Sequence, residues 1–78
     1  MKAYVLMTAK VGTSPAIQDE LRSWGADQGI VEVDAVAGTY DVVAVIEAPD
    51  PRVIGEIVMG RIQALEGVMS TATLLAIG

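Results

Sequence analysis

The stretch "VAGTYDVVAVIEA", residues 36–48, decides the fold. It is typical of two strands joined by a tight turn, with Gly38 supplying a positive φ and Thr39 beside it in a two-residue hairpin. The strand that follows is apolar on both of its faces between Tyr40 and Ile46. A strand of this kind needs a cover on each face of its sheet, which a single layer of helices does not provide.

Outward from this hairpin, the chain alternates between strand and helix patterns. Ser14-Pro15 and Asp50-Pro51 each pair a capping residue with a proline at the first helical position, so a helix is expected after each of them. The expected strands are residues 2–10, 30–37, 40–48 and 68–77. The order β-α-β-β-α-β predicts one α+β domain over residues 1–78. It is ferredoxin-like, with a four-stranded antiparallel sheet and both helices on one face.

The composition narrows the classes of function. The chain contains no cysteine and no histidine, so disulfides, familiar activated nucleophiles and the commonest zinc ligands are missing. Its net charge of −5 disfavours direct binding of nucleic acid. No apolar run approaches a membrane span, and the start alternates like a strand, so we expect a cytoplasmic protein without a cofactor.

Apolar residues are abundant for so short a chain, at 53% of the sequence. Val43 and Val45 fall on the face of their strand that the helices would leave open. The simplest cover for that face is the sheet of a second subunit, and the sequence therefore predicts dimerisation through the sheet. Exposed valines are the alternative.

Asp41 is the residue that a hairpin does not explain, because aspartate is disfavoured in strands. Its carboxylate can accept hydrogen bonds from free backbone N–H groups, or it can pair with the ammonium group of a ligand. Thr39 and Tyr40 add hydroxyl groups beside it, which would suit a small zwitterion. Glu32 and Asp34 lie two residues apart on one strand, and we expect a solvated strand face there rather than a metal site.

Two stretches together resemble a known family. "VEVDAVAGTYDVVAVIEAPD" and, farther on, "LEGVMSTATLLA" resemble the effector-binding domain of the Lrp/AsnC regulators, the RAM domain, over essentially the whole chain. The resemblance implies a ferredoxin-like fold, dimers that pair sheet to sheet, and rings that are octamers or decamers. It also implies an amino-acid effector bound between dimers, near the Gly-x-Tyr-Asp turn.

The resemblance also implies which residues bind the effector. They are Gly38, Thr39, Tyr40 and Asp41 in the turn, with Ser70, Thr71 and Thr73 in the last strand, although ordinary β-propensity also accounts for those three hydroxyls. Full-length regulators begin with a helix-turn-helix domain, whereas this chain begins with a strand and so resembles the stand-alone form. Such a module would sense amino acids for another protein, or assemble with full-length Lrp/AsnC regulators, without contacting DNA itself.

Two other readings stay open from the residues alone. Small dimeric ferredoxin-like proteins include enzymes of the monooxygenase or isomerase type, for which this chain would offer Tyr4, Trp24 and Tyr40. A purely structural oligomer, in which residues 38–41 form only a turn, is the third reading.

Overall fold

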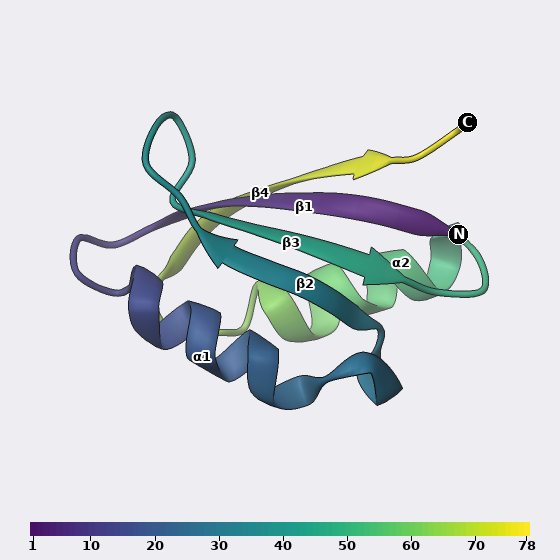
Figure 1. Ribbon diagram of the computed structural model, residues 1–78, viewed down its shortest axis with the longest axis horizontal. Coiled ribbons are helices and arrows are strands. Elements are labelled where there is room, and N and C mark those ends of the chain that lie inside the picture. Colours follow the sequence, from purple (N-terminus) through teal and green to yellow (C-terminus); the bar gives the residue numbers. More distant parts are fainter.

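The computed structural model describes all 78 residues, which form one α+β domain with a layer of helices packed on a β-sheet (Figure 1). The elements follow in the order β1 (Lys2–Ala9), α1 (Ser14–Trp24), the 3₁₀ turn η1 (Ala26–Gln28), β2 (Ile30–Ala35), β3 (Val42–Glu47), α2 (Pro51–Ile57), the π-helical turn η2 (Val58–Ile62) and β4 (Val68–Leu75). The four strands form one antiparallel sheet in the order β2-β3-β1-β4. Both helices lie against the same face of the sheet, so the predicted ferredoxin-like fold is confirmed.

The hydrophobic core fills the space between the sheet and the helices. Alternation along β1 turns Ala3, Val5 and Met7 toward the helices, where all three are fully buried. The core contains 15 residues, and every one of them is apolar. Since no charged or hydrogen-bonding side chain is enclosed, burial of apolar surface supplies the main stabilisation of the domain.

The two helices begin differently. At α2 the prediction is confirmed, because the Asp50 carboxylate accepts a hydrogen bond from the Val53 N–H at 3.0 Å and Pro51 is the first helical residue. At α1 the capping position is Thr13 rather than Ser14. The Thr13 hydroxyl donates to the Lys10 carbonyl at 2.7 Å, so it closes the preceding turn instead of capping the helix.

The connection between β2 and β3 corrects the expected two-residue hairpin. Residues 36–41 form a longer loop, closed where the Val36 N–H donates to the Asp41 carbonyl at 2.9 Å. Gly38 has a φ of +151°, a value far above the φ of about +57° that is typical of the left-handed helical conformation. The loop stands clear of the sheet (Figure 1), and both strands are shorter than the sequence pattern indicated.

At Gly67, the turn before β4 packs closely against the turn before α1. Its φ is +96°, and a Cβ atom built on it would lie 2.7 Å from the Thr13 Oγ1 and 2.8 Å from the Thr13 Cβ. The Gly67 carbonyl also accepts a hydrogen bond from the Lys10 N–H at 2.9 Å. The two turns therefore pack closely only because position 67 has no side chain.

We expect Gly67→Ala to lower the free energy of unfolding by about 2–4 kcal/mol, because alanine is strained at this φ and collides with Thr13. Gly60→Ala is the matched control, since a Cβ atom there meets nothing within 4 Å. Helix propensity predicts a gain of up to about 1 kcal/mol for the control. Urea unfolding of both variants measures the difference, and equal stabilities would contradict the packing described here.

Candidate functional site

Asp41 lies where the loop of residues 36–41 returns to the sheet. Its Oδ2 accepts a hydrogen bond from the Ala9 N–H at 2.8 Å, and its own N–H donates to the Met7 carbonyl at 2.9 Å. The carboxylate thus replaces a main-chain acceptor at the point where β3 begins and the regular ladder with β1 ends. This is the first of the two roles that the sequence suggested for Asp41, a bond to a free backbone N–H group.

Thr8 extends this site to β4. It lies on β1 between the two residues that bind Asp41, and it pairs with Ser70, with 2.5 Å between the two hydroxyl oxygens. Alternation turns Thr8 and Ser70 to the face of the sheet away from the helices. Thr8 is not among the site residues predicted from the sequence. Its position on a central strand, on the same face as Tyr4 and Leu6, is the signal that could have identified it.

The tip of the loop is open to solvent. Gly38 and Thr39 are exposed, Tyr40 is half-buried, and a Cβ atom at Gly38 would meet nothing within 4 Å. Packing against the rest of the chain therefore does not account for Gly38 and Thr39 at the tip. It is accessible to a ligand or to another molecule.

Thr71 and Thr73 do not join this group. They face the helix side of β4, in a groove of about 400 Å³ between α2 and β4. There Gln63 donates from its Nε2 to the Thr71 Oγ1 at 2.9 Å. The rest of the groove is largely apolar and includes Ile54, Val58, Met59 and Leu75. Alternation along β4 thus separates these two threonines from Ser70.

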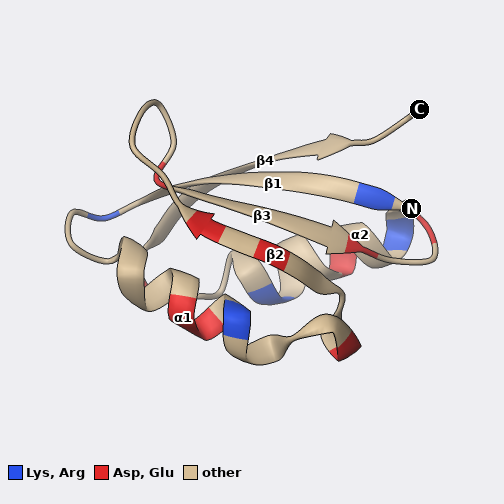
Figure 2. Ribbon diagram, viewed as in Figure 1, with Lys and Arg blue, Asp and Glu red and all other residues tan.

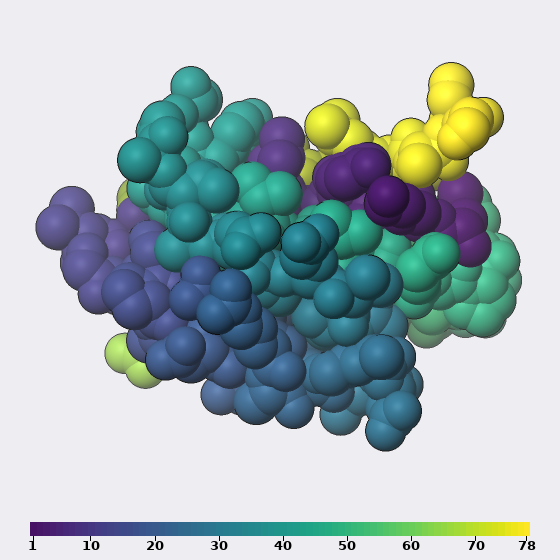
Figure 3. All heavy atoms as spheres, viewed as in Figure 1, coloured from purple at the N-terminus to yellow at the C-terminus, as the bar shows by residue number.

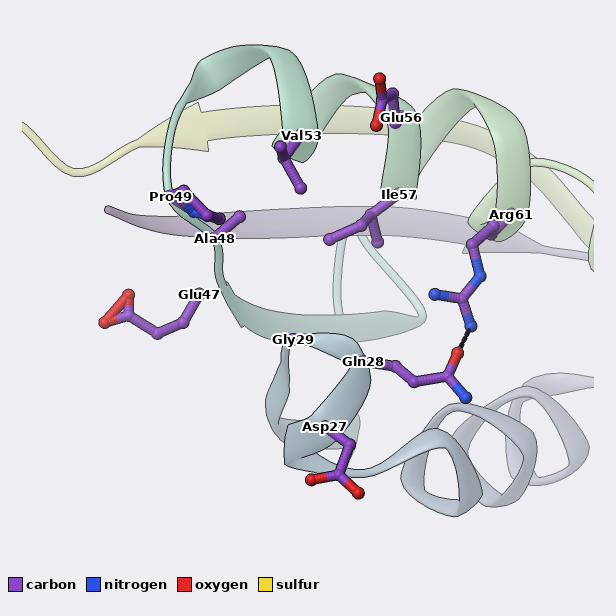
Figure 4. A pocket seen from close by; sticks show the side chains of 10 residues that line it. All are labelled: Asp27, Gln28, Gly29, Glu47, Ala48, Pro49, Val53, Glu56, Ile57 and Arg61. Carbon is purple, nitrogen blue, oxygen red and sulfur yellow. Dashed lines mark hydrogen bonds between the residues drawn. The ribbon is translucent and has the colours of Figure 1, made fainter.

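A second hollow, of about 350 Å³, lies between η1 and α2 (Figure 4). The carboxylates of Asp27, Glu47 and Glu56 point away from one another in this view. Arg61 donates to Gln28 and lies 4.3 Å from the centre of the Trp24 ring. The structure contains no group of three or more acidic side chains that could hold a metal ion. This hollow therefore has no convergent set of chemical groups.

The three aromatic residues considered for an enzyme lie on separate surfaces. Tyr4 is on the open face of the sheet, Tyr40 is in the loop, and Trp24 ends α1 with its indole N–H donating to Glu20 at 3.2 Å. They line no common cavity.

The face of the sheet away from the helices is apolar at its centre and charged at its rim. The central side chains are Tyr4, Leu6, Val43, Val45, Ala72 and Leu74, and none of them is buried in the single chain. At the rim, the Lys2 Nζ lies 5.1 Å from the centre of the Tyr4 ring. A hydrogen bond with Tyr4 raises the pKa of Lys2 above its ordinary value.

No helix in the structure has the length and apolar character needed to cross a bilayer.

Solved structures share this fold. The crystal structure of TTHA0845 from Thermus thermophilus has 31% sequence identity and a TM-score of 0.88, covering 99% of this chain and 92% of that one. E. coli AsnC has 17% identity and a TM-score of 0.87, covering 99% and 50%. The transcriptional regulator NMB0573 in complex with L-Met, from Neisseria meningitidis, has 13% identity and a TM-score of 0.81, covering 99% and 49%. The last two show likeness of fold alone, and this chain spans about half of each.

No curated protein matches the sequence. The model of the Lrp/AsnC ligand-binding domain matches residues 2–78. With the fold, the loop and the residue pattern already described, this match shows that the chain belongs to the Lrp/AsnC ligand-binding domain family.

Proposed function

We propose that this protein is a regulatory module that binds an amino acid, assembles with copies of itself and catalyses no reaction. The observation that supports this most directly is the environment of Asp41. One carboxylate oxygen is fixed by the Ala9 N–H, and the other makes no hydrogen bond within the chain. A negative charge with a set position and a free oxygen is suited to an α-ammonium group.

The neighbouring groups would hold the rest of the ligand. The hydroxyls of Thr8 and Ser70 lie on the open face of the sheet, at the end where Asp41 binds β1, and the exposed residues Gly38 and Thr39 offer backbone N–H groups to a carboxylate. The site is shallow in one chain, because Gly38 and Thr39 at the tip are exposed to solvent. We therefore place the ligand between this loop and a neighbouring copy. The L-Met complex of the Neisseria regulator supports an amino acid as the effector class.

The open face of the sheet is the proposed dimer contact. Its apolar centre includes Leu6, Val43 and Val45, and its rim is charged, which is the usual anatomy of a protein interface. Dimers would then assemble into a ring, for which the family resemblance suggests eight or ten copies. Because ligand and contact share one face, binding and assembly would be thermodynamically linked.

The same proposal covers the cellular setting. We place the module in the cytoplasm, where it would act for another protein or in mixed assemblies with full-length Lrp/AsnC regulators. The net charge of −5 argues against contact between this chain and nucleic acid.

We expect one amino acid among the twenty to raise the melting temperature selectively. At 100 times its dissociation constant, a one-site ligand adds about 2.7 kcal/mol to stability, and each kcal/mol moves the midpoint of so small a domain by about 4–8 °C. A thermal-shift screen finds the ligand, and sedimentation velocity with and without it tests the link to assembly. A screen in which no amino acid shifts the midpoint would contradict the proposal.

Two substitutions of Asp41 separate binding from folding. Asp41→Asn keeps an acceptor for the Ala9 N–H, so we expect stability near that of the parent and binding at least about tenfold weaker, because the charge is lost. Asp41→Ala also leaves that N–H unpaired, and we expect it to cost about 1–3 kcal/mol in addition. Isothermal titration and urea unfolding measure both quantities. Full affinity in Asp41→Asn would remove Asp41 from the site.

Val45→Lys tests the sheet-face contact. A charge at the centre of a buried apolar interface is unfavourable, so we expect a lower molar mass by sedimentation velocity. Val11→Lys is the control, because Val11 is fully exposed in the loop after β1. An unchanged mass in both variants would place the contact elsewhere.

A further inference from the structure

We infer that the effector is an acidic amino acid, aspartate or glutamate, and that Lys10 binds its side-chain carboxylate. The inference rests on the amino-acid binding proposed above and adds the chemical class of the effector. In that proposal, Asp41 binds the α-ammonium group, and backbone N–H groups at the tip of the loop bind the α-carboxylate. The observation that extends it is a lysine without a partner at the same end of the sheet.

Among the five lysine and arginine residues of the sequence, Lys10 alone has a side chain with no partner in the chain. Arg22 and Arg52 form ion pairs with acidic side chains. Lys2 and Arg61 lie over aromatic rings. The side chain of Lys10 is exposed and makes neither kind of contact. Its positive charge is therefore available to a ligand.

The main chain fixes the position of Lys10, which directly follows β1. Its N–H donates to the Gly67 carbonyl at 2.9 Å, and its carbonyl accepts from the Thr13 N–H at 3.1 Å and from the Thr13 hydroxyl at 2.7 Å. None of these bonds involves the lysine side chain. The ammonium group is thus attached to an ordered segment, so less conformational freedom is lost when it binds a ligand.

The alternation of β1 continues through Lys10 and turns its side chain to the open face. The Ala9 N–H is directed to the Asp41 carboxylate, and the Lys10 N–H is directed to the opposite side, toward Gly67. Successive N–H groups with opposite directions are typical of an extended strand. Thr8 faces the open side, and Lys10, two residues farther on, therefore faces the same side.

Lys10 and Asp41 are neighbours on this face. The pairing of Met7 with Val42 places Asp41 opposite Thr8, which makes Lys10 its diagonal neighbour. Diagonal neighbours on one face of a sheet lie about 7–8 Å apart, within reach of a long side chain. The two charged groups do not form an ion pair with each other. A small molecule that carries both signs of charge can therefore bind between them.

The two loops at this end of the sheet are open to solvent. In Figure 2, a basic segment lies in the loop that follows β1, and an acidic segment lies at the base of the loop of residues 36–41. Figure 3 shows both loops at the same end of the molecule, the first violet-blue and the second teal. Val11 and Gly38, one in each loop, are exposed. Glu66 lines a hollow against α1, on the helix side of the sheet, and so leaves Lys10 unpaired.

The donors at this end of the sheet suit a carboxylate. Lys10 supplies three N–H donors, and Thr8 and Ser70 each supply a hydroxyl donor on the same face. The ionised side chain of aspartate or glutamate has two acceptor oxygens and no donor. It would form a charge-assisted hydrogen bond with the lysine, whereas an apolar side chain would gain nothing from it.

Isothermal titration of the intact protein with four amino acids tests the inference. L-aspartate and L-glutamate are compared with L-asparagine and L-glutamine, which have nearly the same shape but no charge on the side chain. We expect one of the two acids to bind at least about tenfold more tightly than its own amide. Equal affinities of acid and amide, or binding only of an amino acid of another class, would overturn the inference and leave the proposed function unaffected. If none of the twenty amino acids binds, the proposed function fails and the inference fails with it.

Lys10→Gln and Arg52→Gln are a matched pair of variants, because each removes one exposed positive charge. Arg52 lies in the first turn of α2, beyond the far end of β3, where it pairs with Glu56. Lys10→Gln removes no side-chain contact, so we expect an unchanged midpoint of urea unfolding.

We expect Lys10→Gln to weaken binding of the favoured acid at least about tenfold and to change binding of its amide by less than about twofold. Arg52→Gln should leave both affinities at the parent values. A preference for the acid that persists in Lys10→Gln would overturn the inference. An equal loss for acid and amide would also overturn it, because Lys10 would then bind a group that the two molecules share.

Discussion

The central position of β1 is the constraint on which the rest of this structure depends. β1 pairs with β3 on one side and with β4 on the other, so its alternation sets which side chains of both neighbours share a face. Ala3, Val5 and Met7 face the helices and are fully buried. Their neighbours along the strand must therefore face away, and this places Thr8 in one row with Ser70 and beside Asp41. The core and the candidate site thus follow from the same alternation.

Much of the architecture was predictable because it depends on short-range patterns. The alternation of β1, the Asp50-Pro51 helix start and the order of the elements along the chain are all local or topological signals, and the structure confirms them. The prediction of a two-residue hairpin was wrong, because a local sequence pattern does not reveal a hydrogen bond between residues that are far apart in the chain. The Ala9 N–H donates to the Asp41 carboxylate, which lies 32 residues farther along the chain. With Asp41 bound in this way, β3 begins only at Val42, farther from Gly38 than a two-residue hairpin requires.

The candidate site was predictable only in part for a related reason. Family resemblance brings Ser70, Thr71 and Thr73 together as hydroxyl residues of one strand, yet a strand turns successive side chains to opposite faces. Ser70 faces the open side near Asp41, whereas Thr71 binds Gln63 on the helix side. Thr8 carries no motif of its own, and only its pairing with Ser70 brings it into the site.

The two uncovered surfaces have a common physical origin. A chain of 78 residues with a single helical layer covers one face of its sheet, and α1 additionally caps the β2 edge through Arg22 and Gln18. What remains is an apolar open face and an uncharged β4 edge. Ser70 belongs to both surfaces, and Thr8 on β1 lies between Ser70 and Asp41. A ligand bound beside Asp41 would therefore lie at the border of the open face, and its charged groups would interact with any copy that packs there. The proposed binding of a ligand and the proposed assembly would therefore both depend on the open face of the sheet.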